Sequence, residues 1–153
     1  MPESPATASV TVNATPEALY DLVTDIPKMG RLSPECTGGK WLGGATGPVV
    51  GAKFRGTNKR GRIRWSTVNR VVEAERGKVF AFETDGSGAR WTYRFEADGE
   101  ATVVSESREM FKARPKSATF FATLLLGGTE SHDAEMDQGL NDTLQRLKTV
   151  AEG

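Results

Sequence analysis

Residues 121–151 read FATLLLGGTESHDAEMDQGLNDTLQRLKTVA, and this stretch decides the fold. Every third or fourth residue falls on one continuous, mainly apolar stripe, which is typical of one face of a long helix. Two adjacent glycines, Gly127 and Gly128, would weaken or bend this helix without changing its period. The sequence therefore predicts one long C-terminal helix with a single face to bury, whose stripe consists of Phe121, Leu125, Gly128, His132, Met136, Leu140, Leu144, Leu147 and Ala151.

Upstream of this helix, between Cys36 and Ser107, short alternating apolar stretches are separated by turn sequences such as Gly47-Pro48 and Asp98-Gly99. Alternation with period two indicates strands, and Gly-containing turns connect them. Such short connections favour consecutive antiparallel hairpins, because parallel strands need crossovers of a dozen or more residues. We expect strands near residues 37–45, 51–58, 62–74, 78–85, 89–97 and 101–111.

The N-terminal region adds one strand and two short helices. Residues 8–12 alternate between apolar and polar side chains, as in a half-buried strand. Thr15 and Pro16 then provide a helix cap and a first-turn proline. Pro27 predicts a break, and a second short helix is expected over residues 29–34.

Composition sets limits on the class of protein. The 153 residues are 37% hydrophobic, and 20 basic residues balance 20 acidic ones, which is typical of one soluble globular domain. We expect a disordered N-terminal arm of residues 1–7 and a single domain of residues 8–152. A single cysteine, Cys36, and a single histidine, His132, exclude multi-cysteine zinc sites and sites with several histidines, and no metal is expected. The sequence has no GxxxxGK(S/T) or GxGxxG motif, and no cofactor is expected either. The chain has no apolar run long enough to span a membrane and no signal peptide, which predicts a cytoplasmic protein, and its Ala, Gly and Arg content points to a bacterial source.

A layered arrangement follows from this order of elements. A twisted antiparallel sheet has an apolar face to cover, and only the C-terminal helix is long enough to lie across it. We therefore expect an α+β fold in which about seven strands curl around that helix. If the helix stands off the concave face, a cavity opens between the two.

The order of elements resembles the helix-grip fold of birch-pollen-allergen-like proteins, START lipid-transfer domains and bacterial polyketide cyclases. Within this SRPBCC superfamily, the chain is most similar to small actinobacterial members of the polyketide cyclase/dehydrase and lipid transport group. The resemblance covers residues 6–152 and implies a cavity for an apolar ligand more firmly than it implies a reaction. It rests on residues 12–20 (VNATPEALY), 23–25 (VTD), 33–36 (SPEC), 41–42 (WL), 51–56 (GAKFRG), 64–67 (RWST), 80–83 (FAFE) and 140–152.

Aromatic residues on two neighbouring predicted strands are the main candidates for contact with such a ligand. Phe80 and Phe82 share one strand face, and Trp91, Tyr93 and Phe95 share the same kind of face on the next strand. Such rings bury a large area and suit a flat or ring-containing ligand, although a stripe of this kind also forms ordinary core. The complete set of predicted ligand contacts adds Trp65, Phe121, Leu125, His132 and Met136. The resemblance implies a cavity rim at Pro34, Glu35 and Trp41, where Glu35 is either a rim carboxylate or a solvated one.

Several polar residues have two readings that alternation alone leaves open. His132 lies on the helical stripe and either contacts a ligand or is a satisfied core residue, and His132 and Tyr93 are the candidates for proton transfer. Glu106 and Arg108 face either the interior or solvent, and a buried Glu106 would need a partner, for which Arg90 and Arg94 are candidates. Arg55 poses the same question, whereas Trp65 is expected inward and Arg64 outward.

The charges are distributed unevenly along the chain. Residues 36–72 contain eight basic residues and no acidic one, whereas residues 128–153 contain six acidic and two basic residues. Both are explained by solvated faces, and the basic hairpin of residues 53–64 is alternatively a surface for an anionic partner. The balanced total charge and the lack of an RNA-binding or helix-turn-helix motif argue against nucleic acid.

Three functions remain open from the sequence. The first is non-covalent binding of a small hydrophobic ligand, lipid-like or aromatic, between sheet and helix. The second is catalysis by a polyketide cyclase or dehydrase, through substrate positioning and proton shuttling. The third is a regulatory interaction module that uses the basic hairpin. Whether the chain is an enzyme stays undecided, and a homodimer is compatible with the pattern.

Overall fold

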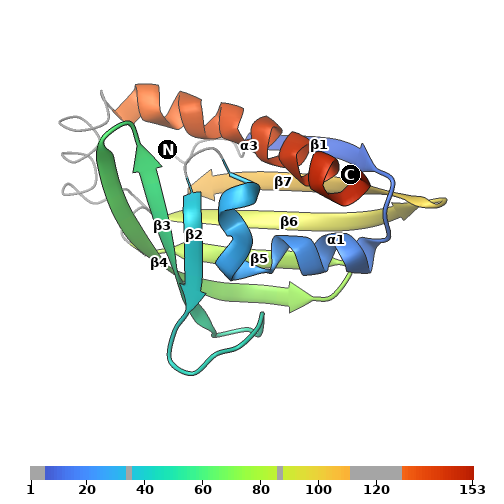
Figure 1. Cartoon of the computed structure of the whole chain (residues 1–153), viewed down its shortest axis with the longest axis horizontal. Coiled ribbons are helices and arrows are strands. Elements are labelled where there is room, and N and C mark those ends of the chain that lie inside the picture. Colours follow the sequence, from blue (N-terminus) through green and yellow to red (C-terminus); the bar gives the residue numbers. More distant parts are fainter. Residues whose placement is uncertain (1–5, 34–35, 86–87, 111–128) are drawn as a thin grey trace.

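The computed structural model describes residues 6–33, 36–85, 88–110 and 129–153, with backbone alone for residue 6 and residues 129–138. Seven strands form one antiparallel sheet in the order β1-β7-β6-β5-β4-β3-β2. Figure 1 shows that the sheet is strongly twisted, with α3 lying across β1 and β7. The strands are β1 (Ala6–Val12), β2 (Cys36–Trp41), β3 (Lys53–Arg60), β4 (Ile63–Glu75), β5 (Val79–Thr84), β6 (Ala89–Asp98) and β7 (Ala101–Met110), and the helices are α1 (Pro16–Val23), the 3₁₀ helix η1 (Ile26–Arg31) and α3 (Thr129–Glu152).

These elements confirm the expected α+β helix-grip architecture, including two short helices between the first two strands. Each expected strand is present within a few residues of its predicted bounds, and β1 begins at Ala6, earlier than the expected start near residue 8. The long helix is confirmed over Thr129–Glu152, whereas residues 121–128 of the predicted stripe lie outside the described residues. The fold class was thus predictable from hydrophobic periodicity, turn sequences and the family resemblance taken together.

The helix α1 begins as its sequence predicts. The Thr15 hydroxyl accepts a hydrogen bond from the Ala18 backbone N–H at 3.1 Å, and Pro16 is the first helical residue. The predicted position of the second short helix, residues 29–34, is wrong. Its 3₁₀ turn starts at Ile26, because the fixed φ of Pro27 suits a first helical turn and does not break one there.

The long strand β4 connects the two halves of the twisted sheet. It pairs with β3 along its first part and with β5 along its second part. Its register with β5 shifts between Val71 and Glu73, which marks an irregularity of the β-bulge type. Such a bulge bends a strand and increases its twist, so β2–β4 turn away from β5–β7, as Figure 1 shows.

The core lies between the concave face of the sheet and the helices. The side chains of Leu140, Leu144 and Leu147 on α3 are at most 2% exposed. The C-terminal end of α3 is held to β1 by polar contacts: Lys148 Nζ donates to the Thr11 carbonyl at 3.0 Å. One face of α3 is therefore fixed over the edge of the sheet, as the helical stripe predicts.

Close packing of η1 on β2 depends on glycine. A Cβ atom at Gly39 would lie 2.8 Å from Ile26 Cγ2, 2.9 Å from the Ile26 carbonyl oxygen and 3.1 Å from the Arg55 carbonyl oxygen. Two of these three atoms belong to backbone, which cannot rotate away. We expect Gly39→Ala to lower the free energy of unfolding by about 1–3 kcal/mol, the usual cost of overpacking.

Urea unfolding measures this effect, and Gly47→Ala is the matched control. A Cβ atom at Gly47 meets no atom within 4 Å. The control should therefore retain the wild-type stability, and a Gly39→Ala protein of equal stability would show that η1 can move off β2.

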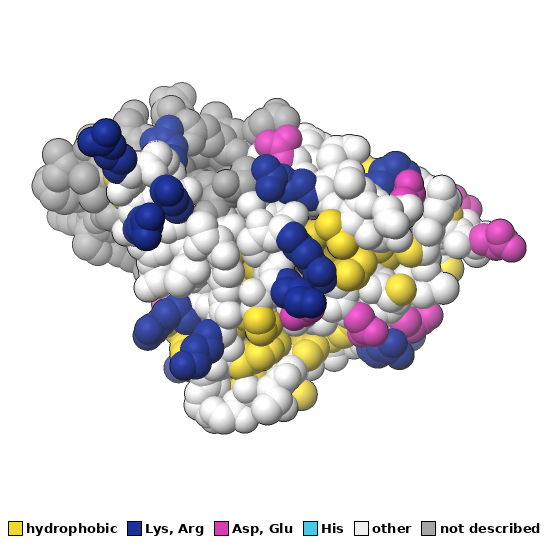
Figure 2. All heavy atoms as spheres, in the orientation of Figure 1, with side chains coloured by type: hydrophobic (Ala, Val, Ile, Leu, Met, Phe, Trp, Pro, Cys, Tyr) yellow, Lys and Arg dark blue, Asp and Glu magenta, His cyan; other side chains and the backbone are white. Residues whose placement is uncertain are grey.

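The charged side chains are distributed unevenly over the surface. Figure 2 shows Lys and Arg side chains gathered over the β2–β4 side of the molecule. Val49 and Val50, in the loop between β2 and β3, are 61% and 65% exposed, more than any other large hydrophobic residue among those described. None of the described helices has the length and apolar character that crossing a membrane requires.

Candidate functional site

The predicted aromatic rows lie on neighbouring strands and share the concave face. In the register of β5 and β6, Phe80 is opposite Tyr93 and Phe82 is opposite Trp91. Phe80, Phe82 and Tyr93 are all less than 9% exposed, and Trp91 is half-buried against the core. The strand pairing therefore brings together the aromatic residues that the sequence singled out.

One end of this aromatic surface is ordinary core. Tyr20 of α1 places its ring edge-on against Phe80, with centroids 6.2 Å apart, and against Phe95, with centroids 5.9 Å apart. Phe82 packs in the same way on Phe54 of β3, at 5.1 Å. Because other protein side chains pack against these rings, Phe80 and Phe95 contribute mainly to the stability of the core.

The other end of the concave face is polar. On β7, Thr102, Val104, Glu106 and Arg108 alternate inward, and their exposed fractions are 0%, 0%, 2% and 6%. Carboxylates and guanidinium groups are almost never fully buried unless they are paired or hydrogen-bonded. The inward orientation of Glu106 and Arg108 answers the question that alternation left open, because Val104 fixes the parity of the strand.

Glu106 lies opposite Tyr93 in the pairing of β6 and β7. Burial raises the pKa of the Glu106 carboxyl to about 8, although a hydrogen bond from the Tyr93 hydroxyl opposes this shift. Burial first and the Glu106 charge second raise the pKa of Tyr93 well above its usual value. At neutral pH both groups therefore hold their protons, and Glu106 can donate as well as accept a hydrogen bond.

One oxygen of Glu106 is available for a further contact. Its Oε1 atom is buried and has no hydrogen-bond partner among the residues that the structure describes. A buried polar atom without a partner costs roughly 1–3 kcal/mol, so proteins rarely leave one without a reason. The concave face thus carries a neutral acid with unused hydrogen-bonding capacity beside aromatic rings.

Arg108 lies two residues along β7, at the end of this polar region. Its guanidinium lies over the Trp91 ring, 5.8 Å from the ring centroid, and its Nη2 atom is 3.8 Å from the Met110 sulfur. Stacking on an indole ring stabilises a guanidinium group that is shielded from bulk water. Trp91 and Arg108 therefore form a positively charged aromatic surface next to Glu106.

A second buried polar pair was missed by sequence analysis. Thr84 Oγ1 donates to Asn69 Oδ1 at 2.7 Å, and Asn69 Nδ2 donates to Thr67 Oγ1 at 3.3 Å. Asn69 is 4% exposed and Thr84 is 6% exposed, both on the concave face. The available signal was parity, since Asn69 occupies an inward position two residues before Val71, which is fully buried.

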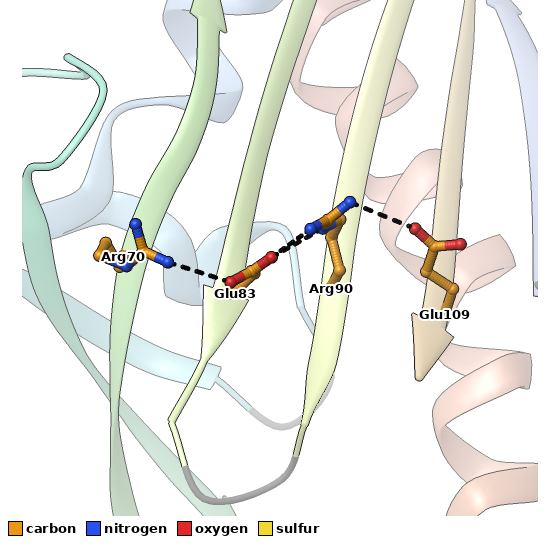
Figure 3. Close-up of polar contacts among 4 residues, drawn as sticks. All are labelled: Arg70, Glu83, Arg90 and Glu109. Carbon is orange, nitrogen blue, oxygen red and sulfur yellow. Dashed lines mark hydrogen bonds and ion pairs between the residues drawn. The ribbon is translucent and has the colours of Figure 1, made fainter. Parts of the chain in front are cut away.

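The predicted partners of a buried Glu106 are wrong. Arg90 and Arg94 lie on the opposite, outer face of β6, where Arg90 pairs with Glu83 and lies 3.8 Å from Glu109. Figure 3 shows the resulting row of alternating charges, which Arg70 completes by contacting Glu83 at 3.2 Å. The physical reason is strand parity: Tyr93 points inward, so its neighbours in sequence point outward.

The structure places the remaining predicted residues as follows. Trp65 is half-buried and has the inward parity of Asn69, as predicted, while Arg64 and Arg55 are exposed on the outer face. Trp41 is half-buried, and its ring packs edge-on against Phe54 at 5.6 Å. Pro34, Glu35, Phe121 and Leu125, together with the side chains of His132 and Met136, lie outside the described residues, so their contact with a ligand stays a prediction.

The expected cavity between sheet and α3 also stays a prediction. A shallow depression of about 330 Å³ is lined by Glu73, Arg90, Arg94 and Glu109 among others, but it lies on the outer face of the sheet. Charged walls and openness to water do not suit an apolar ligand. The chemistry of Tyr93, Glu106 and Trp91 is on the concave side, and we therefore place the candidate site there.

Other reactive chemistry has little support. Burial raises the pKa of the Cys36 thiol, which donates a hydrogen bond to the Gly38 carbonyl at 3.3 Å. A thiol held in its protonated form is a poor nucleophile, so Cys36 fits a structural role better than a catalytic one. Within the described ranges, no three His, Cys, Asp or Glu side chains are close enough together to hold a metal ion.

Comparisons with known proteins give matches over nearly the whole chain. The family described as polyketide cyclase / dehydrase and lipid transport matches residues 5–152. No curated protein matches the chain significantly. A solved structure of a polyketide-cyclase-like protein from Corynebacterium glutamicum is 30% identical, covers 99% of this chain and 94% of that one, and has a TM-score of 0.66.

More distant structures share the fold alone. The di-domain ARO/CYC protein StfQ from the steffimycin biosynthetic pathway is 14% identical with a TM-score of 0.71, covering 97% of this chain and 51% of its own. The Aha1 dimer from Colwellia psychrerythraea is 13% identical with a TM-score of 0.66, covering 98% and 97%. A homodimer of the present protein stays a prediction. With a match over nearly its whole length and a helix-grip fold to support it, the chain belongs to the polyketide cyclase / dehydrase and lipid transport family.

Proposed function

We propose that this protein binds a small, largely apolar ligand that carries a hydroxyl or keto group, on the concave face beside Glu106. One observation carries the proposal: the buried Oε1 atom of Glu106 has no partner among the described residues, although it lies next to Tyr93 and the Trp91 row. A ligand oxygen at hydrogen-bond distance would satisfy this atom. Family membership supports the same class of ligand.

Aromatic and polar side chains make different contributions to ligand binding. The rings of Trp91 and Phe82 offer apolar area, which contributes roughly 25 cal/mol per Å² buried before ordering costs are subtracted. Glu106 and Tyr93 then fix the orientation of the ligand, because a neutral acid and a phenol can each donate or accept. An ionised carboxylate would reject a keto oxygen, so the raised pKa of Glu106 widens the range of acceptable ligands.

Naphthol and naphthalene provide a direct test, since they differ only in a hydroxyl group. We expect wild-type protein to bind naphthol roughly 10-fold more tightly at neutral pH, as one added hydrogen bond to a buried partner predicts. Glu106→Leu should abolish this preference while retaining naphthalene binding. Quenching of tryptophan fluorescence measures both affinities.

The matched control is Glu96→Gln, because Glu96 is an exposed carboxylate on β6. This variant should retain the wild-type preference for naphthol. If neither compound binds to the wild-type protein, or if the preference persists in Glu106→Leu, the proposed function is wrong.

A second candidate function is a cyclase or dehydrase reaction at the same site. Glu106 favours it, because a buried acid whose pKa is about 8 can transfer a proton near neutral pH. Tyr93, in contact with Glu106, would serve as proton relay or as hydrogen-bond donor to a developing oxyanion. Turnover of a poly-β-keto substrate that is lost in Glu106→Gln, with ligand binding retained, would distinguish catalysis from binding alone.

A further inference from the structure

The outer face of β2, β3 and β4 carries an unusual concentration of positive charge. We call it the basic face and define it by six exposed residues on these three strands. Residues 36–72, which include β2, β3 and most of β4, contain no acidic side chain. Figure 2 shows the corresponding gathering of Lys and Arg on this side of the molecule. The six residues are Lys40, Lys53, Arg55, Lys59, Arg64 and Arg70.

Strand register places these cations directly opposite one another. Lys40 of β2 is paired with Arg55 of β3, and Lys59 and Lys53 of β3 are paired with Arg64 and Arg70 of β4. Like charges in directly opposed positions destabilise a sheet. All six residues of the basic face therefore form three unfavourable pairs.

The neighbouring half of the same face follows the opposite pattern. Arg70, Glu83, Arg90 and Glu109 alternate in sign across β4 to β7, and each contacts the next (Figure 3). Of the six basic-face residues, only Arg70 has an ion pair within the described part of the chain. Among the described residues, the rest of the basic face therefore has no counter-charge, which leaves it able to attract anions or an anionic partner.

Two exposed apolar side chains lie at one end of the basic face. Val49 and Val50 are in the loop between Lys40 and Lys53, and they are 61% and 65% exposed. Two hydrogen bonds hold this loop to β4: Gly51 N–H donates to the Val71 carbonyl at 2.9 Å, and Val71 N–H donates to the Ala52 carbonyl at 2.9 Å. Within the loop, Ala52 N–H donates to the Val49 carbonyl at 3.0 Å. The two valines are thus presented by a fixed turn next to cations.

We propose that the basic face and the Val49–Val50 loop dock on the surface of an anionic lipid bilayer. Anionic headgroups attract clustered Lys and Arg, and the interface below them accepts apolar side chains. Nucleic acid or an acidic protein would satisfy the charges of the basic face. Nucleic acid has no apolar layer for two neighbouring valines, and an acidic protein would need an apolar patch in the matching place, whereas a bilayer supplies anionic headgroups and an apolar interface over its whole surface. The inference does not depend on the ligand proposed above.

Co-sedimentation with vesicles tests the docking. Wild-type protein should bind vesicles that contain phosphatidylglycerol, should bind pure phosphatidylcholine vesicles far more weakly, and should dissociate as salt rises. The triple variant Lys53→Gln/Arg55→Gln/Lys59→Gln should lose affinity on the order of 100-fold, given the typical contribution of each basic residue at an anionic surface. It should also melt at a higher temperature than wild type, because opposed like charges are removed. A loss of binding together with a gain in stability cannot come from misfolding.

A second triple variant controls for net charge. Lys78, Arg94 and Arg146 are exposed and lie outside the basic face, and Lys78→Gln/Arg94→Gln/Arg146→Gln changes the total charge by the same amount. It should retain most of the affinity for phosphatidylglycerol vesicles. If both triple variants lose the same affinity, binding reflects total charge and the proposal is overturned.

The valines separate a bilayer from other anionic partners. Val49→Ser/Val50→Ser should weaken vesicle binding by about 10-fold, since partial burial of each valine contributes several-fold. Its binding to a soluble polyanion such as heparin should be unchanged. If this double variant binds vesicles as well as wild type does, or if wild-type protein fails to bind phosphatidylglycerol vesicles, the bilayer is excluded as the partner.

Discussion

Glu106→Gln should make the protein more stable than wild type at alkaline pH, with a difference that grows between about pH 4.5 and pH 8. In the folded state, burial raises the pKa of Glu106 to about 8 from a usual value of 4.5. Across that window the folded protein retains a proton that the unfolded chain has lost. The contribution of Glu106 to stability therefore falls as pH rises and levels off above about pH 8.

The magnitude follows from the same linkage. One retained proton changes the free energy of unfolding by about 1.4 kcal/mol per pH unit, which over this window reaches on the order of 5 kcal/mol. Glutamine has no proton to lose and can still accept a hydrogen bond from Tyr93. The stability of the variant should consequently lack this component of the pH dependence.

Urea unfolding at a series of pH values measures the difference between the two proteins. Comparing variant with wild type removes the contribution of all other titrating groups. Glu96→Gln, on the exposed face of β6, is the control and should follow the wild-type curve. Parallel curves for Glu106→Gln and wild type would mean that the Glu106 carboxyl is ionised and hydrated in the folded protein.

Phe54→Ala should lower the free energy of unfolding by about 3–5 kcal/mol, the usual cost of removing a buried phenyl ring. The Phe54 side chain is fully buried. The centroid of its ring lies 5.6 Å from that of Trp41 on β2 and 5.1 Å from that of Phe82 on β5. Phe54 therefore connects both halves of the twisted sheet. The cavity left by alanine would be lined by these two rings.

Chemical denaturation checks this value, and Phe54→Leu is the matched control because leucine retains most of the apolar volume. We expect the leucine variant to lose much less stability than the alanine variant. A loss below about 1 kcal/mol in Phe54→Ala would show that the two halves of the sheet can close over the space.

Periodicity explains why most of the fold could be predicted from the sequence. The period of two in residues 36–107 and the near-helical period of the C-terminal stripe each follow from one buried face. Thr15 and Pro16 located the start of α1 because capping is a local effect. The position of η1 was predicted wrongly, because Pro27 either ends a helix or begins one, and only packing on β2 decides between these.

The polar part of the candidate site was less predictable. Sequence analysis identified Tyr93, Phe82 and Trp91, whose size and spacing indicate a buried face. Whether Glu106 points inward depends on the strand register of β7 against β6, which no local property of its neighbours Ser105 and Ser107 reveals. The bulge after Val71 adds a further difficulty, because it shifts the pairing of β4 with β5.

The row Arg70–Glu83–Arg90–Glu109 has a consequence for how the sheet assembles. In the native pairing each charge is opposite one of the other sign. A hairpin slipped by two residues would keep the same side chains inward, yet it would place Glu83 opposite Thr92 or Gly88 rather than Arg90. Hydrophobic burial alone cannot distinguish these alignments. The charged row therefore favours the native register of these hairpins over registers that are slipped by two residues.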